Sequence, residues 1–248
     1  TLTSAARDAS NASDLLAELY RRGLDPQVIS GEVEGSLTFL GVARDFVGSR
    51  ILVADNGGGS TELALGSMMG GGVLELECVR STDVGCRRIT ERFLAGGVTP
   101  DSEAAARAEV RGLLDEAERV VDLSAPGRLV GLAGTITTVT AHALGLTDFD
   151  AEAIDCAELS VETTLASCEA IIHSTLEQRA SWGYLAPGRR DVIAAGALVW
   201  SEVVTRVVER TAAAGRPLKR VTTSLYDILD GIALSLVPEP EPTEGTPA

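Results

Sequence analysis

The sequence predicts an α/β protein whose sheet is organised around one glycine-rich hairpin. Apolar residues run unbroken over residues 51–54, the chain then crosses D-N-G-G-G-S-T-E, and apolar residues resume at Leu63. A short apolar run bounded by turn residues indicates a strand buried on both faces. The return after three glycines indicates a second, antiparallel strand. Further short strands, predicted at residues 129–133 and 217–224, alternate with long helical patterns, which is typical of an α/β fold.

The segment before the hairpin predicts short elements. Residues 1–10 indicate the end of a strand that runs into a helix, and residues 11–22 predict a second helix that stops at Gly23. A short strand is expected at residues 26–30, followed by a helix over residues 32–46 that packs on one side. The inward side chains of that helix should be Val33, Leu37, Leu40 and Phe46.

After the hairpin, residues 73–80 alternate as a third antiparallel strand. The final strand, at residues 217–224, precedes a closing helix. The Pro/Glu-rich tail at residues 238–248 should be disordered. Helices are expected at residues 83–94, 100–121, 134–143, 159–178, 192–208 and 226–236.

Composition excludes several classes of protein. The 248 residues are 45% hydrophobic, enough to bury one or two cores. A net charge of −15 argues against nucleic acid as a partner, because phosphate backbones require a basic face. No apolar run reaches the roughly 20 residues needed to cross a bilayer, and the N-terminus lacks a signal-peptide core, so no membrane partner and a cytoplasmic location are expected.

The basic residues, cysteines and histidines give no strong signal. Of the 21 basic residues only Lys219 is lysine, which we attribute mainly to base composition. The four cysteines lack C-x-x-C spacing and predict reduced, packed thiols rather than a zinc site or disulfides. His142 and His173 fall within helices without an evident acidic or metal-ligand partner, so both are interpreted as structural or exposed.

The hairpin loop carries the strongest chemical signal. Asp55 leaves the buried strand at its end, where its carboxylate must meet water, a metal or a partner. The backbone N–H groups of the loop can converge on an anion, helped by glycines that tolerate positive φ. A simple hairpin bend is an equally open interpretation of three glycines. The candidate phosphate-binding residues are Gly57, Gly58, Gly59, Ser60 and Thr61.

Two familiar phosphate signatures are absent. A P-loop needs Lys directly after its last glycine and then a helix, and the dinucleotide fingerprint also needs a helix at the glycines. Phosphate bound here would therefore lie between two strands, which is the geometry of the actin-like, ribonuclease H-like ATPase superfold. A second candidate contact is the helix N-terminus at Gly134 and Thr135, where small residues for helix–sheet packing are the alternative.

Several ordered motifs resemble the exopolyphosphatase and guanosine pentaphosphate phosphohydrolase (Ppx/GppA) family. The resemblance runs nearly end to end, and the ordered set is far more specific than any single motif. The motifs are T-S-A-A-R-D-A-S-N at residues 3–11, V-I-S-G-E-V-E at 28–34, D-N-G-G-G-S-T-E at 55–62, D-V-G-C at 83–86, A-G-T-I-T-T at 133–138, R-R-D-V-I-A-A-G-A at 189–197 and D-I-L-D-G-I-A-L at 227–234.

The resemblance implies a domain organisation, and the sequence departs from the family pattern in three ways. Residues 1–45 resemble the C-terminal part of the family's first domain and residues 46–237 its complete second domain. The family's first phosphate loop, upstream of these motifs, is not in the sequence, so the chain is expected to be truncated at its N-terminus and inactive alone. Asn56 stands where the family has an apolar residue, and Val33 replaces one of two paired acids before Glu34.

The resemblance also implies a function. It is metal-dependent hydrolysis of the terminal phosphoanhydride of inorganic polyphosphate, with release of orthophosphate. Glu34 matches the acid taken as general base for the attacking water. Asp55 and Glu62 match carboxylates near a divalent cation, and hard oxygen ligands suit Mg²⁺. Arg7 matches an arginine near the phosphate path.

Two other functions stay open. The same site could hydrolyse guanosine pentaphosphate, with the loop at residues 131–138 as the place for nucleoside contacts. A non-catalytic protein that binds polyphosphate or a nucleotide is the third reading, favoured by Val33 and Asn56. Because strand side chains alternate, Asn56 should point opposite to Asp55 and hydrogen-bond loop backbone or a nearby side chain. Apolar faces in the first segment that stay uncovered could bind a second copy of the chain, so a homodimer is a further possible assembly.

Overall fold

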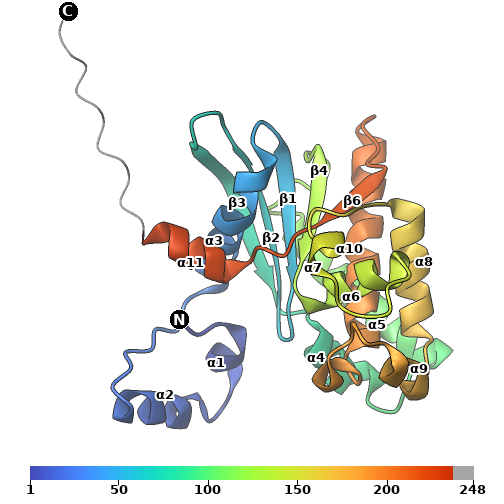
Figure 1. Ribbon diagram of the computed structural model, residues 1–248, viewed down its shortest axis with the longest axis horizontal. Helices are drawn as coiled ribbons and strands as arrows, with labels where there is room; N and C mark the ends of the chain where they lie inside the picture. The colour runs from blue at the N-terminus through green and yellow to red at the C-terminus, as the bar shows by residue number, and fades with distance from the viewer. Residues whose placement is uncertain (237–248) are drawn as a thin grey trace, which may run out of the picture.

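The computed structural model describes residues 1–236 and contains one six-stranded sheet (Figure 1). The strand order is β3-β2-β1-β4-β6-β5. β1 pairs antiparallel with β2 and parallel with β4, so the hairpin and the later strands meet at the centre of the sheet. The predicted disordered tail lies outside the described residues. The strands are β1 (Arg50–Asn56), β2 (Thr61–Met68), β3 (Leu74–Thr82), β4 (Arg128–Leu132), β5 (Glu158–Ser160) and β6 (Arg220–Thr223).

Helices cover both faces of this sheet. α3 and α11 lie on one face, and α5, α6, α8 and α10 lie on the other (Figure 1). A π-helix, Thr90–Leu94, continues α4, and 3₁₀ turns occupy Arg44–Phe46 and Pro187–Arg189. The α-helices are α1 (Ser4–Asp8), α2 (Ala12–Arg21), α3 (Gly31–Ala43), α4 (Cys86–Ile89), α5 (Pro100–Ala117), α6 (Gly134–Ala143), α7 (Ala151–Ile154), α8 (Val161–Ile172), α9 (Leu176–Ser181), α10 (Ile193–Ala213) and α11 (Ile228–Ser235).

The central strand explains why both faces are covered. Its side chains alternate, so Ile51 and Val53 join Phe39 of α3 in one core, whereas Leu52 and Ala54 join the opposite core under α10. All four are at most 1% exposed. The prediction of an α/β protein with a doubly buried central strand is confirmed.

Two sequence-based expectations about this body are wrong. Val33 does not face inward on α3, since it is 45% exposed, and the close contact with the sheet uses Gly35 instead. A Cβ on Gly35 would meet Val79 of β3 at 2.6 Å, so only glycine lets the helix lie this close. Residues 159–178 are not one helix. Residues 158–160 form β5, an edge strand paired with β6, before α8 begins at Val161.

The first segment, α1 and α2, lies apart from the helices that cover the sheet (Figure 1). α2 buries none of its residues. The short strand expected at residues 26–30 is reduced to one parallel bridge between Leu2 and Val28. By contrast, α3 packs directly on β1, β2 and β3 and against α11. The domain boundary at residue 45 stays a prediction, but the packing continues across it.

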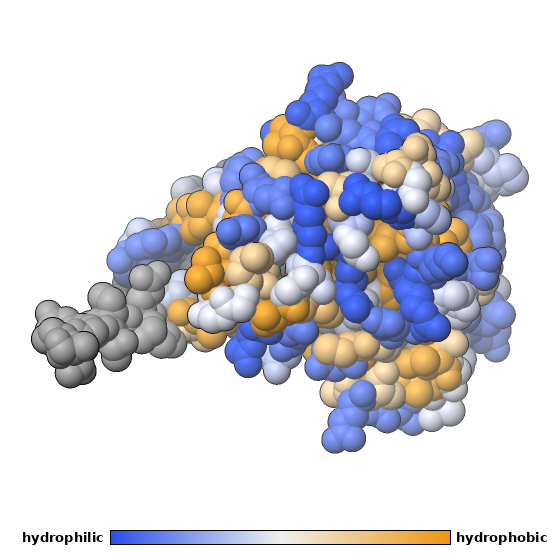
Figure 2. Space-filling view, turned by 90° about the horizontal axis from the view of Figure 1, so that it is seen from above, coloured by the Kyte–Doolittle hydropathy of each residue, from blue (hydrophilic) through white to orange (hydrophobic). Residues whose placement is uncertain are grey.

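The surface is mixed in character. On the face shown in Figure 2, hydrophilic residues surround small groups of hydrophobic residues. The most exposed large apolar side chain among residues 1–236 is Leu236, at 78%, followed by Leu229 of α11 at 69%. Within the same residues, no helix combines the length and apolarity needed to cross a membrane.

Glycines also set the contact between α3 and α11. A Cβ on Gly231 would overlap the backbone carbonyl of Leu37, and a Cβ on Gly41 would overlap that of Asp227. The two helices therefore touch through their backbones.

The close contact between α3 and α11 predicts how an added methyl group at Gly231 changes the free energy of unfolding. Gly231→Ala should lower the free energy of unfolding by about 1 to 3 kcal/mol, because overpacking forces the two backbones apart. Gly112→Ala in α5 is the matched control, since its added Cβ meets nothing within 4 Å. The control should be neutral or stabilising by up to about 1 kcal/mol. Chemical denaturation of both variants measures the difference, and equal effects would contradict the close contact.

Candidate active site

The glycine-rich loop between β1 and β2 is fixed by its carbonyl groups. The carbonyl of Gly57 accepts a hydrogen bond from the N–H of Cys86 at 3.0 Å, and that of Gly58 accepts one from the N–H of Arg87 at 2.9 Å. These donors belong to the first turn of α4, so N–H groups at the helix N-terminus hydrogen-bond the loop carbonyls. Within the loop, the N–H of Gly57 donates to the carbonyl of Ser60 at 3.0 Å, so Gly57 has no N–H left for a phosphate.

Arg88 ties the same loop to the first segment of the chain. Its Nε donates to the carbonyl of Gly59 at 2.9 Å, and its Nη2 donates to Asp8 of α1 at 2.6 Å. A Cβ on Gly59 would lie 2.5 Å from Ser4 Oγ, so this glycine permits the close approach of α1. α1 therefore forms one wall of the loop's surroundings.

Space requires glycine at position 59, whereas a Cβ on Gly58 would make only an ordinary contact with Arg87 at 3.9 Å. Positive φ angles were also expected in this loop. None of Gly57, Gly58 and Gly59 has a positive φ, so that part of the expectation is wrong. Within residues 1–236, the backbone N–H groups of Gly58, Gly59 and Ser60 donate to no backbone acceptor. Unpaired loop N–H groups of this kind are the donors that a phosphate oxygen requires.

Two candidate metal ligands lie opposite each other at the base of the loop. Asp55 on β1 and Glu62 on β2 are direct partners in the antiparallel register. Glu62 is 2% exposed and accepts a hydrogen bond from Ser81 Oγ at 2.7 Å. Asp55 accepts a weaker one from Thr38 Oγ1 at 3.5 Å. The register thus forces two carboxylates onto the same face, toward α3.

Burial and mutual repulsion raise the pKa of both acids. Loss of hydration raises the pKa of Asp55 to about 7, with further contributions from the charges of Glu34 and Asp227. Loss of hydration raises the pKa of Glu62 to about 8, and the charges of Asp55 and Glu34 add to the effect. The three candidate carboxylates of the sequence therefore act on one another electrostatically, as expected for groups of one site.

Glu34 enters from the first turn of α3, which Ser30 caps by accepting the N–H of Val33 at 3.3 Å. Arg7 Nη1 donates to Glu34 Oε2 at 2.9 Å and to the carbonyl of Ile29 at 2.7 Å. The predicted phosphate contact Arg7 is thus engaged with the predicted general base. Its role toward phosphate stays a prediction.

The cavity in front of the loop is about 490 Å³. Glu34 and the loop residues Gly57 to Ser60 line it, opposite α1 and beside Arg87 and Arg88. Asp55 and Glu62 are not among the lining side chains. The structure therefore brings the general-base candidate and the loop into one cavity, with the acid pair beside it.

A second recess of about 280 Å³ shares Gly57, Gly58 and Arg87 with this cavity. It is lined by the N-terminus of α6 at Gly134 and by Arg189. The guanidinium of Arg189 lies so close to Gly134 that a Cβ there would overlap it. A cation at the positive end of a helix, with no acidic partner among residues 1–236, makes this recess favourable for an anion.

Asn56 lies between the loop and this recess. Its side chain points opposite to Asp55, as predicted, and is 2% exposed. Its Nδ2 donates to the carbonyl of Gly196 in α10 at 3.0 Å, so the partner is helix backbone rather than the loop. Its Oδ1 has no hydrogen-bond partner in the described part of the chain and borders the recess.

The comparisons with known proteins agree with this geometry. The profile of the Ppx/GppA phosphatase family matches residues 2–214. Exopolyphosphatase 2 of Mycobacterium tuberculosis is 38% identical over 244 residues, which cover 94% of this chain and 73% of that protein. The chain belongs to the Ppx/GppA family. Ppx/GppA proteins are phosphoanhydride hydrolases, so this chain is assigned to an enzyme family.

Solved structures of relatives give the same result for the fold. The crystal structure of an exopolyphosphatase-like protein superposes with a TM-score of 0.86 at 38% identity, covering 94% of this chain and 74% of that one. The Ppx/GppA enzyme of Aquifex aeolicus has a TM-score of 0.74 at 25% identity, with coverages of 94% and 73%. These proteins have the actin-like ATPase fold, so the predicted superfold is confirmed.

Several residues of this Ppx/GppA site were not singled out from the sequence. Arg87, Arg88 and Arg189 surround the loop, although the arginine content had been attributed to base composition. Ser81 and Asp227 act on the buried acids. A local signal was present for three of them, because Arg87, Arg189 and Asp227 lie in or directly beside the D-V-G-C, R-R-D and D-I-L-D motifs.

The raised pKa values predict an inverse dependence of stability on pH. Without divalent cations, native Asp55 and Glu62 keep protons that the unfolded chain releases above pH 4 to 4.5. The free energy of unfolding should therefore fall as the pH rises from about 4 to about 8. Each pKa unit corresponds to about 1.4 kcal/mol, so in Glu62→Gln the fall should be smaller by about 2 kcal/mol or more.

Denaturant unfolding across this pH range, with a chelator present, tests the prediction. Glu75→Gln, an exposed change on β3, is the matched control and should behave like the wild type. Equal pH dependence in Glu62→Gln and the wild type would show that Glu62 is not held protonated.

Proposed function

We propose that the protein is an exopolyphosphatase, which hydrolyses the terminal phosphoanhydride of inorganic polyphosphate and releases orthophosphate. The observation that carries this proposal is that Glu34 and the unpaired N–H groups of the loop line the same cavity. The 38% identical Exopolyphosphatase 2 supports the choice of substrate.

The proposed reaction follows from these positions. The loop N–H groups bind oxygens of the terminal phosphate and hold it toward Glu34. The Glu34 carboxylate accepts a proton from a water molecule as the water oxygen bonds to the terminal phosphorus. The bridging P–O bond breaks, and its electron pair leaves with the shortened polyphosphate. Positioning and charge neutralisation supply most of the acceleration in such transfers.

Arg7 has a defined place in this scheme. Its guanidinium fixes one oxygen of Glu34 at 2.9 Å and leaves the other for water. An oriented carboxylate loses less entropy when it accepts the proton. Arg7 therefore acts as a positioning residue for Glu34 in the proposal.

The acid pair fits a divalent cation. Mg²⁺ is held by one or two carboxylates plus waters and substrate phosphates, and Asp55 and Glu62 are two buried carboxylates whose pKa values rise for want of a counter-charge. Asp55, Glu62 and Glu34 do not bring three ligand atoms within 4.8 Å of one another in the described chain, which suits a cation that completes its shell from the substrate. Bound there, it would neutralise charge on the phosphate.

Substitution of Glu34 tests the mechanism. Glu34→Gln in the full-length protein should lower kcat for phosphate release by about 10² to 10⁴-fold, because general-base catalysis supplies about this factor. Glu32→Gln, two residues earlier and exposed, is the matched control and should keep near wild-type activity. Both variants should unfold like the wild type. Near-normal release by Glu34→Gln would remove this residue from the mechanism.

Guanosine pentaphosphate is the second candidate substrate, and the recess at α6 favours it. The recess adjoins the loop and offers the N-terminus of α6 and the guanidinium of Arg189 to the phosphates of a nucleotide. We expect kcat/KM to be higher for long-chain polyphosphate than for guanosine pentaphosphate in a side-by-side assay. The reverse order would assign the nucleotide, and tight polyphosphate binding without phosphate release would indicate a binding protein.

A further inference from the structure

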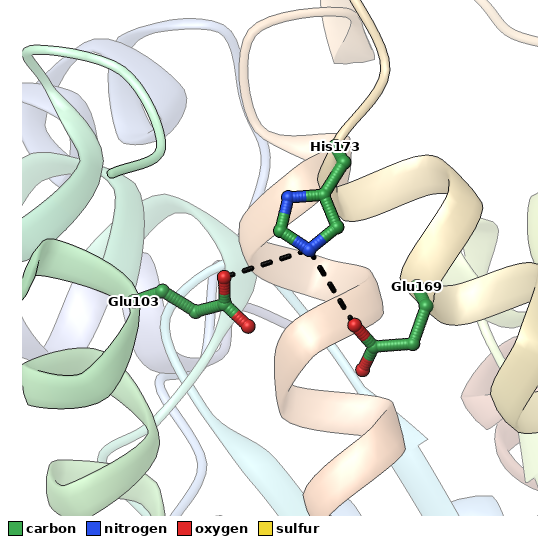
Figure 3. Close-up of side chains that lie close together, drawn as sticks. All are labelled: Glu103, Glu169 and His173. Atoms are coloured by element: carbon green, nitrogen blue, oxygen red, sulfur yellow. Dashed lines mark ion pairs between the residues drawn. The ribbon is translucent and has the colours of Figure 1, made fainter. Parts of the chain in front are cut away.

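Three potential metal ligands meet on two helices away from the candidate active site (Figure 3). His173, directly after α8, points its Nε2 at Glu103 Oε2 of α5 at 3.6 Å and at Glu169 Oε2 of α8 at 3.5 Å. The expectation that His173 lacks an acidic partner is wrong. Glu169 lies one helical turn before His173, and Glu103 comes from α5, much earlier in the chain.

Arg107 orients both carboxylates from behind. Its Nε donates to Glu103 Oε1 at 2.9 Å, and its Nη2 donates to Glu169 Oε1 at 2.6 Å. Each carboxylate therefore has one oxygen fixed by the guanidinium and the other turned toward the imidazole. Outer hydrogen bonds of this kind hold metal-ligating carboxylates in place.

The distances from the imidazole nitrogen to the two carboxylates are close to those around a tetrahedral ion. Metal–ligand bonds of about 2.0 to 2.1 Å place tetrahedral ligand atoms about 3.3 to 3.4 Å apart. The two observed nitrogen–oxygen distances, 3.5 and 3.6 Å, are close to this value. Within residues 1–236, these residues form the only group of three whose ligand atoms all lie within 4.8 Å of one another.

The local charge balance also allows a cation. With His173 neutral, two carboxylates face one guanidinium, which leaves one net negative charge. The neighbouring Glu202 carboxylate, which Arg107 also contacts, is balanced by Arg111 at 2.6 Å. Side chains of His173 and Glu169 are 56% and 49% exposed, so an ion can enter from solution.

We propose that Glu103, Glu169 and His173 form a surface site for one zinc-class divalent cation, with water as the fourth ligand. An imidazole with two carboxylates suits Zn²⁺ and not Mg²⁺, which prefers oxygen ligands alone. The ion cross-links α5 to α8, both of which pack on α10. This site is independent of the proposed phosphate chemistry.

The competing arrangement is an ion pair of protonated His173 with the two carboxylates, which has the same geometry and no metal. Calorimetric titration with ZnCl₂ at neutral pH, in the presence of saturating Mg²⁺, separates the two. A Cys156→Ser background removes the exposed thiol as an alternative zinc ligand. We expect one equivalent of Zn²⁺ per chain and a rise in the thermal unfolding midpoint on binding.

The ligand variants and their control define the site. His173→Gln and Glu169→Gln should each lower the zinc affinity at least 10-fold and abolish the rise in the unfolding midpoint. Glu162→Gln, at an exposed position in the first turn of α8, should change neither. Metal-free midpoints of all variants show that each is folded. Absence of zinc binding by the parent, or equal binding by parent and His173→Gln, would overturn the proposal.

Discussion

The structure of this site depends on the burial of two like charges. Antiparallel pairing of β1 with β2 sets Asp55 directly opposite Glu62, on the face that α3 covers. Ionising both there would cost several kcal/mol unless a proton or a cation compensates, because neither has a basic partner among residues 1–236. The raised pKa values of about 7 and 8 express this cost. A divalent cation would relieve this cost, and its remaining charge would attract the phosphate of a substrate to the same place.

Two neighbouring residues at the end of β1 point toward opposite faces of the sheet. Asp55 points toward α3 and the general-base candidate Glu34, whereas Asn56 points toward α10 and the recess at α6. In the loop that follows, the carbonyls of Gly57 and Gly58 accept from α4, and the N–H groups of Gly58, Gly59 and Ser60 meet no backbone acceptor among residues 1–236. A substrate bound on the loop would thus meet the acid cluster on one side and Arg189 on the other. This arrangement explains how one site could suit both a phosphate chain and a nucleotide.

Sequence patterns predicted the parts of the fold that depend on apolar burial. The run at residues 51–54 and the glycine loop gave the hairpin, and the periodic segments gave α5, α6 and α10 close to their observed bounds. Hydropathy patterns did not predict the packing or the element bounds where small or polar residues make the contacts. α3 meets its neighbours through glycines, which carry no hydropathy signal, and β5 is a three-residue edge strand that only β6 specifies.

The same distinction holds for the site. Glu34, Asp55, Glu62 and the loop could be named from motifs, because each motif is local in sequence. The arginines at 87, 88 and 189 and the group of Glu103, Glu169 and His173 arise from segments that only the folded chain brings together. Their roles depend on distances between helices, and these distances cannot be deduced from the residue types alone.

The most direct test of the central claim is the number of protons released when Mg²⁺ binds. Calorimetric titrations at pH 7 in buffers of different ionisation enthalpy measure this number. If Asp55 and Glu62 hold protons that the cation displaces, the wild type should release about one proton or more, and Glu62→Gln should release fewer. Binding of Mg²⁺ without proton release, or equal release by both proteins, would contradict the account.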